Sequence, residues 1–120
     1  KINLDAVEYE AMNMAKVIEY NKLVRDRIPD LIAASGKQCV TETLSEDEFL
    51  KYLDKKMDEE LAEYHHDHNA EELADLMEVI LAAAAVRGYT PEQLEQIRLK
   101  KAKERGSFQQ RILLRDVIEG

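Results

Sequence analysis

The chain has 120 residues, enough for one domain, and carries 25 acidic against 17 basic side chains, for a formal net charge of −8. This charge argues against a general binder of nucleic acids or anionic membranes, because both functions need a basic face. The single Cys39 excludes an intrachain disulfide framework, and neither a membrane-length apolar run nor a signal-peptide pattern is present. We therefore expect a soluble, cytoplasmic protein with a single domain over residues 1–120.

Few glycines and prolines, with abundant alanine, leucine, glutamate and lysine, predict an all-α fold. Apolar side chains recur with helical spacing over about residues 5–19, so residues 1–19 are expected to contain an extra N-terminal helix. In LVRDRIPDLIAASG, Pro29 predicts a kink or a fresh helix start, and Gly36 fits a C-terminal cap. The following QCVTETL is short and β-branched, which indicates an extended linker or a minor strand.

Two helices are expected at the centre of the chain. Ser45 opens the capping box S-E-D-E, and the helix that it starts is predicted to reach about His65. Asn69 caps the next helix, which is predicted to run through AAAAV to Arg87, where Gly88 breaks it. The short HHDHN turn between them predicts an antiparallel pair at the middle of a helical bundle.

A last helix is predicted from the start signal Thr90-Pro91-Glu92-Gln93, which combines an N-cap, a first-turn proline and a glutamine at the third position. It should end near Gly106. The tail SFQQRILLRDVIEG is ambiguous between a short helix and an extended arm.

The first central helix carries acids beside its apolar side chains. On a helical wheel its apolar stripe consists of Leu50, Leu53, Met57, Leu61 and Tyr64. Glu60 lies at the edge of this stripe, Glu63 one step further round and Glu59 further out.

The second central helix is apolar nearly all round, which is typical of a buried helix. Its main stripe consists of Leu73, Leu76, Met77, Ile80 and Ala84, and a second strip beside it consists of Val79, Ala83 and Val86. Glu72 and Asp75 lie on that second strip, so Asp75 in particular is expected inside the protein. A lone carboxylate is costly to bury and needs to be paired or neutralised.

Four acids would therefore meet across the hairpin: Glu60, Glu63, Glu72 and Asp75. Each helix contributes an i, i+3 pair, so both members face the same way. Like charges this close repel, and a hard divalent cation bound through oxygen, Mg²⁺ with some water retained, would balance them. Two ordinary explanations compete: Glu72 completes a capping box after Asn69, and Glu59, Glu60 and Glu63 pair with Lys55 or Lys56 on a solvated face.

The turn between the helices holds His65, His66 and His68. Clustered histidines bind Zn²⁺ in some proteins, but adjacent histidines in a tight turn converge poorly on one ion, so we interpret them as loop residues. A di-iron carboxylate site is disfavoured because the inner faces lack the paired Glu-x-x-His pattern. Tyr52, Tyr64 and Phe108 are candidates to stack on a base, although helix aromatics more often belong to the core.

Taken together, EELAE and EELAD resemble the E-E-x-x-E … E-x-x-D signature of the all-α nucleoside triphosphate pyrophosphatases, the superfamily of MazG-like and phosphoribosyl-ATP pyrophosphohydrolase-like proteins. YNKLVRDRIPDLI at residues 20–32 resembles the N-terminal segment of one subgroup, and KAKERGSF at residues 101–108 its basic ending. The three blocks extend over about residues 20–115 in the expected order. In this chain Gly106-Ser107-Phe108 replaces a Gly-Gly sequence, and only eight residues separate Glu63 from Glu72, fewer than in many members.

The resemblance implies that Glu60, Glu63, Glu72 and Asp75 hold Mg²⁺, with Mn²⁺ as a substitute. It implies that Glu59 is an accessory ligand or orients the attacking water. Four basic residues match positions in the flanking blocks: Lys22, Arg25, Lys101 and Arg105. They would clamp phosphates, unless they are ordinary surface cations.

The activity implied by the resemblance is hydrolysis between the α and β phosphates of a nucleotide, in a house-cleaning role. Phosphoribosyl-ATP pyrophosphohydrolase and a non-catalytic helical interaction module are the alternatives. The resemblance also implies a homodimer or homotetramer that completes the helical bundle, and four short helices with so apolar a central helix agree with this.

Overall fold

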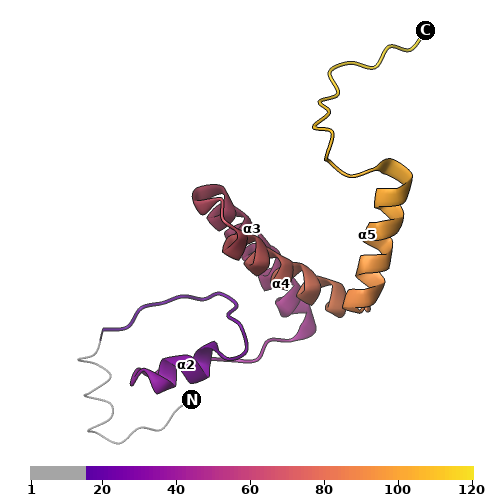
Figure 1. Cartoon of the computed structure of the whole chain (residues 1–120). Coiled ribbons are helices and arrows are strands. Elements are labelled where there is room, and N and C mark those ends of the chain that lie inside the picture. Colours follow the sequence, from indigo (N-terminus) through magenta and orange to yellow (C-terminus); the bar gives the residue numbers. More distant parts are fainter. Residues whose placement is uncertain (1–15) are drawn as a thin grey trace, which may run out of the picture.

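The computed structural model describes residues 16–120, and these residues form helices without any strand (Figure 1). The helices are α2 (Ile28–Ala34), α3 (Glu46–Asp67), α4 (Ala70–Val86) and α5 (Pro91–Arg105). The predicted all-α fold is therefore confirmed. None of the helices in this range is both long and apolar enough to cross a membrane.

Helix α2 begins afresh at its proline, and the chain is not kinked there. Pro29 lies in the first turn, where its missing N–H leaves no hydrogen bond unmade. Gly36 follows the helix with a φ of +86° and donates its N–H to the carbonyl of Ala33, as predicted for a C-terminal glycine. Residues 37–44 then form an extended linker. Residues 16–19 are not helical, so the helix expected over residues 5–19 does not reach Glu19; its remainder lies outside the described residues.

Helices α3 and α4 begin at the predicted caps. The side chain of Ser45 accepts from the N–H of Glu48, and that of Asn69 accepts from the N–H of Glu72. Helix α3 ends two residues later than expected, at Asp67, and His68 turns the chain with a φ of +50°. The prediction that all three histidines are loop residues was therefore wrong for two of them, which lie in the last helical turn: His65 and His66.

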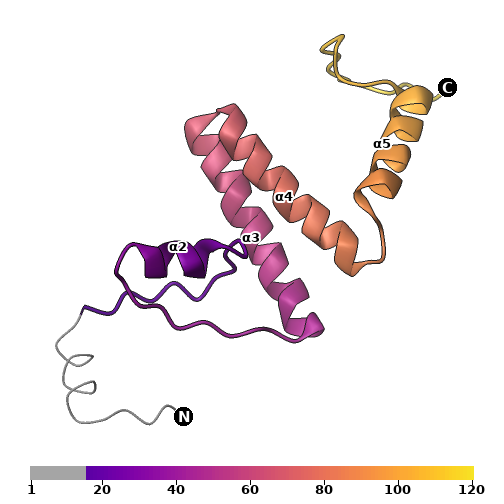
Figure 2. The same cartoon turned by 60° about the horizontal axis from the view of Figure 1, so that its bottom comes forward.

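Figure 2 shows α3 and α4 side by side and antiparallel, as predicted. The buried apolar side chains between residues 16 and 120 are Leu53, at 4% exposure, Val79 and Ala84. Val79 belongs to the strip that also carries Glu72 and Asp75, so that strip faces α3.

Of the stripe predicted to be the main apolar face of α4, Ala84 is buried, but Leu73, Met77 and Ile80 are exposed. A helix with two adjacent apolar faces does not reveal on a wheel which of them packs. The small Ala83 of the second strip allows close approach to α3, and Arg25 from the segment before α2 lies beside Asp75.

Helix α5 has both hydrogen bonds of its predicted capping box, between Thr90 and Gln93, and ends before Gly106 as predicted. It packs weakly on α4 and diverges from the hairpin, and the tail beyond it is an extended arm (Figures 1 and 2). The Cα radius of gyration is 21.1 Å, compared with about 14 Å for a compact domain of this length. The core of the chain is accordingly thin.

We predict that Leu53→Ala lowers the free energy of unfolding by about 2 to 3 kcal/mol, the low end for a buried leucine, because few side chains surround it. Leu99→Ala on α5 is the matched control, since Leu99 is exposed, and it should change stability by less than about 0.5 kcal/mol. Urea denaturation followed by circular dichroism measures both values. Equal losses in the two variants would show that Leu53 is not part of the core.

Candidate functional site

Carboxylates from both central helices converge at the closed end of the hairpin. Glu60 of α3 and Glu72 and Asp75 of α4 each place an oxygen so that all three lie within 4.8 Å of one another. The Glu60 side chain is 13% exposed, and that of Asp75 is 40% exposed. We call these three residues the acidic cluster. Three of the four carboxylates predicted to meet across the hairpin therefore share one group.

The fourth, Glu63, joins Glu72 through a second group, in which Asp67 is the third member and the oxygens again lie within 4.8 Å. Asp67 was missed from the sequence because the helix was predicted to end at about His65. Its position four residues after Glu63, on the same helical face, would have indicated it had α3 been extended by one turn.

The cap at Asn69 explains only part of the placement of Glu72. The Asn69 side chain accepts from the Glu72 N–H at 3.0 Å, but within residues 16–120 the Glu72 side chain makes no reciprocal bond to the cap and no ion pair. Only one of the two hydrogen bonds of a capping box is therefore present among the described residues. The Glu72 carboxylate is left to face the other acids.

Burial raises the pKa of the Glu72 carboxyl, and the negative charges of Asp75, Glu63, Asp67 and Glu60 raise it further. The direction of this shift means that ionising Glu72 beside its neighbours is unfavourable. A cation placed among these oxygens would remove that penalty.

Some of the acids already have cationic partners on the same chain. Arg25 donates to Asp75 at 2.6 Å, and Lys56 lies 3.4 Å from Glu60, so the prediction of a helical ion pair with Lys56 also holds. The Arg25 pair joins the segment before α2 to α4. Both side chains of that pair are substantially exposed, so it contributes about 0 to 1 kcal/mol to stability.

Glu59 lies on the lysine side of α3 and belongs to neither group of convergent acids. It accepts from Lys22 at 2.6 Å and from Lys56 at 2.7 Å. Partial burial, the largest single influence, raises the pKa of Glu59, but the hydrogen bonds and charges of the two lysines together outweigh it and leave the pKa lowered. Glu59 is thus held ionised next to the acidic cluster.

The predicted phosphate-binding cations separate into two sets. Lys22 and Arg25 reach the hairpin through the ion pairs above. Lys101 and Arg105 lie toward the far end of α5, which diverges from the hairpin (Figures 1 and 2), and no ion pair joins them to described residues. In a single chain these two are surface cations.

Two other features lie apart from the acidic cluster. His66 pairs with Asp67 at 2.6 Å, and that hydrogen bond raises the pKa of the His66 imidazole, but neither group of convergent acids includes a histidine.

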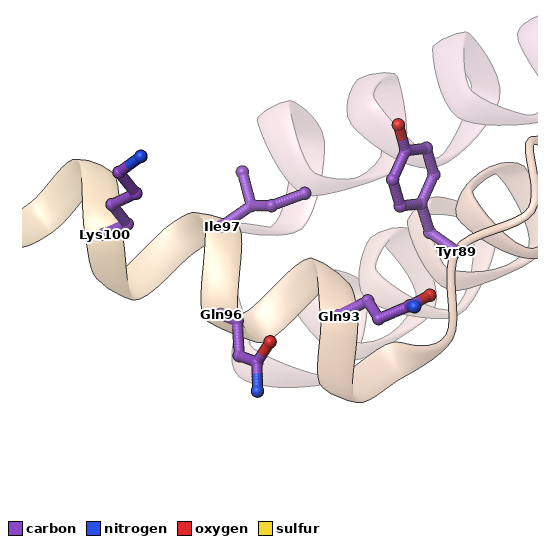
Figure 3. A pocket seen from close by; sticks show the side chains of 5 residues that line it. All are labelled: Tyr89, Gln93, Gln96, Ile97 and Lys100. Atoms are coloured by element: carbon purple, nitrogen blue, oxygen red, sulfur yellow. The ribbon is translucent and has the colours of Figure 1, made fainter.

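A shallow groove of about 320 Å³ runs along α5 (Figure 3). It is lined by Tyr89, Gln93, Gln96, Ile97 and Lys100, and no carboxylate contributes to it.

The acidic cluster fits a hard divalent cation better than a soft one, because its donors are carboxylate oxygens only. Around octahedral Mg²⁺, with bonds of about 2.1 Å, neighbouring oxygens lie about 3 Å apart and opposite ones about 4.2 Å apart. The three oxygens of the cluster lie within 4.8 Å of one another, which is compatible with such a site.

Comparison with known proteins identifies no family for this chain. No protein-family profile and no solved structure matches it. An uncharacterized protein of Mycolicibacterium smegmatis is 62% identical to it over 42 residues. That match spans 35% of this chain and 43% of the mycobacterial protein, so it covers less than half of either.

We predict that Glu72→Gln raises the thermal midpoint of the metal-free protein at pH 7. The pKa of Glu72 is raised, so its ionisation costs stability once the pH exceeds that pKa, and glutamine removes the cost. Below about pH 4 the carboxyl is protonated and the two proteins should melt alike. Differential scanning fluorimetry in EDTA, with the exposed Glu71→Gln as control, measures the difference. A gain that persists unchanged at low pH would contradict the repulsion.

Proposed function

We propose that the chain is a Mg²⁺-dependent nucleotide pyrophosphohydrolase, which cleaves a nucleoside triphosphate between its α and β phosphates to give a monophosphate and pyrophosphate. The observation that carries the proposal is the convergence of Glu60, Glu72 and Asp75 from two helices. The order of the acidic and basic sequence blocks supports the same reaction. A house-cleaning role in the cytoplasm is part of this proposal.

In this proposal Glu60, Glu63, Glu72 and Asp75 hold Mg²⁺ or Mn²⁺. When bound, such a cation neutralises charge on phosphate oxygens and lowers the pKa of a bound water. In this proposal Glu59, held by its two lysine partners, is an accessory ligand or orients the attacking water at the edge of the cluster. Such a cation also explains how a chain with a net charge of −8 attracts a polyanion.

Phosphoribosyl-ATP pyrophosphohydrolase uses the same chemistry and differs only in substrate. A non-catalytic interaction module is the second candidate, and two observations favour it: Arg25 and Lys56 already neutralise acids of the cluster, and much apolar surface is exposed. An interaction module would tolerate the loss of the Asp75 charge and would not respond to divalent cations.

We predict that Asp75→Asn reduces pyrophosphate release from nucleoside triphosphates by about 100-fold, because it removes one charged oxygen ligand of the cluster. Asp58→Asn on the exposed surface of α3 is the matched control and should keep wild-type activity. The measurement is pyrophosphate release from a panel of nucleotides, with and without Mg²⁺. Absence of Mg²⁺-dependent release in the wild type would exclude the hydrolase and favour the interaction module.

We also propose that a second copy of the chain covers the exposed face of α4, giving a homodimer or homotetramer. The face is formed by Leu73, Met77 and Ile80, which share one side of the helix at i, i+4 and i+7. The accessible surface of the chain is 11469 Å², compared with about 6,600 Å² for a compact monomer of 13.8 kDa. This excess supports a partner.

We predict that Met77→Glu shifts the protein from an oligomer to a monomer in sedimentation velocity experiments. Met77 is 60% exposed, so glutamate there is tolerated by the single chain but would bury a charge against a second copy. Leu99→Glu on α5 makes a similar exchange at an exposed position outside this face and should leave the oligomer intact. A wild-type protein that sediments as a monomer would refute the proposed assembly.

A further inference from the structure

A pocket lined by lysines lies beside the acidic cluster, on the other side of α3. It has a volume of about 180 Å³, far more than the roughly 30 Å³ that one water molecule occupies in the liquid. Its wall combines the segment before α2 with one face of α3: Asn21, Lys22, Tyr52, Lys55, Lys56 and Glu59. We call it the lysine pocket.

Three ammonium groups against one carboxylate give this pocket a positive balance in a chain that is acidic overall. Lys22 and Lys56 share the single carboxylate, Glu59, at 2.6 and 2.7 Å. Lys55 has no acidic partner among residues 16–120, and its Nζ lies 5.0 Å from the centre of the Tyr52 ring. A bound anion would therefore pair with Lys55, whose charge has no acidic partner among residues 16–120.

The lysine pocket and the acidic cluster share a boundary. Lys56 contacts Glu59 inside the pocket and also lies 3.4 Å from Glu60 of the cluster. A ligand that is anionic at one end and binds cations at its other end can therefore extend across this boundary. A polyphosphate has this chemistry, since its successive phosphate groups both accept hydrogen bonds from ammonium groups and coordinate divalent cations.

We propose that the lysine pocket binds the β- and γ-phosphates of the substrate, which leave together as pyrophosphate, and that Lys55 is their principal contact. This inference rests on the proposed function for the identity of the ligand. With the terminal phosphates held in the pocket, the α-phosphate faces the acidic cluster.

The test is calorimetric titration of the 120-residue chain with pyrophosphate in the presence of Mg²⁺. Lys55→Gln should weaken pyrophosphate binding by about tenfold, the low end for a hydrogen bond between charged groups. Lys51→Gln removes the same charge one turn earlier on the exposed surface of α3, outside the pocket, and should change binding by less than about twofold. Circular dichroism of both variants verifies that the helices are retained.

Titrations with inorganic phosphate and with a nucleoside monophosphate identify the group that the pocket recognises. Pyrophosphate binding that depends on Lys55, with monophosphate binding independent of it, supports the inference. Equal loss in Lys55→Gln and Lys51→Gln, or no pyrophosphate binding by the wild type, overturns it.

The rate of nucleotide hydrolysis decides the proposed function separately. Hydrolysis by the wild type together with identical binding by both lysine variants would leave the hydrolase standing and remove the lysine pocket from it. Pyrophosphate binding through Lys55 without hydrolysis of any nucleotide would retain the pocket as an anion site and remove the enzyme.

Discussion

Repulsion among carboxylates at the closed end of the α3–α4 hairpin is the constraint on which the rest of this structure depends. The hairpin brings Glu60, Glu72 and Asp75 together with few apolar contacts to hold them there. Two cations offset part of this charge: Lys56 beside Glu60, and Arg25, from a segment 50 residues away in the chain, beside Asp75. The negative charge of the cluster is only partly neutralised, and a bound divalent cation would neutralise the rest. In its electrostatics the cluster therefore resembles a cation-binding site.

One side of α3 carries the acidic cluster and another carries the lysine pocket, and Lys56 lies at the boundary between them. It contacts one acid on each side, Glu59 and Glu60, which are consecutive in sequence and point to different surroundings. Because consecutive residues on a helix diverge by about 100°, two adjacent glutamates serve different environments without any irregularity in the backbone. This geometry explains why Glu59 and Glu60, the two adjacent acids of EELAE, have different surroundings.

Local signals in the sequence were sufficient to predict the helices, because caps depend on a few adjacent residues: Ser45, Asn69 and Thr90 each cap a helix in the structure. The meeting of acids across the hairpin was also predictable, since it follows from helical spacing and a short turn. The buried face of α4 was not, because that helix has two apolar faces and only its partner selects between them. The ion pair between Arg25 and Asp75 was equally hidden, as no periodicity links residues so far apart.

The pair between Arg25 and Asp75 has a consequence for any metal that enters the cluster. A cation arriving at Asp75 replaces a guanidinium that is already there, so its binding is an exchange of partners, and the apparent affinity is the difference between two ionic interactions. Added salt weakens the exposed pair as well as the incoming cation's attraction to the acids. The two effects partly cancel, which makes the occupancy of the cluster less sensitive to ionic strength than that of an open group of carboxylates.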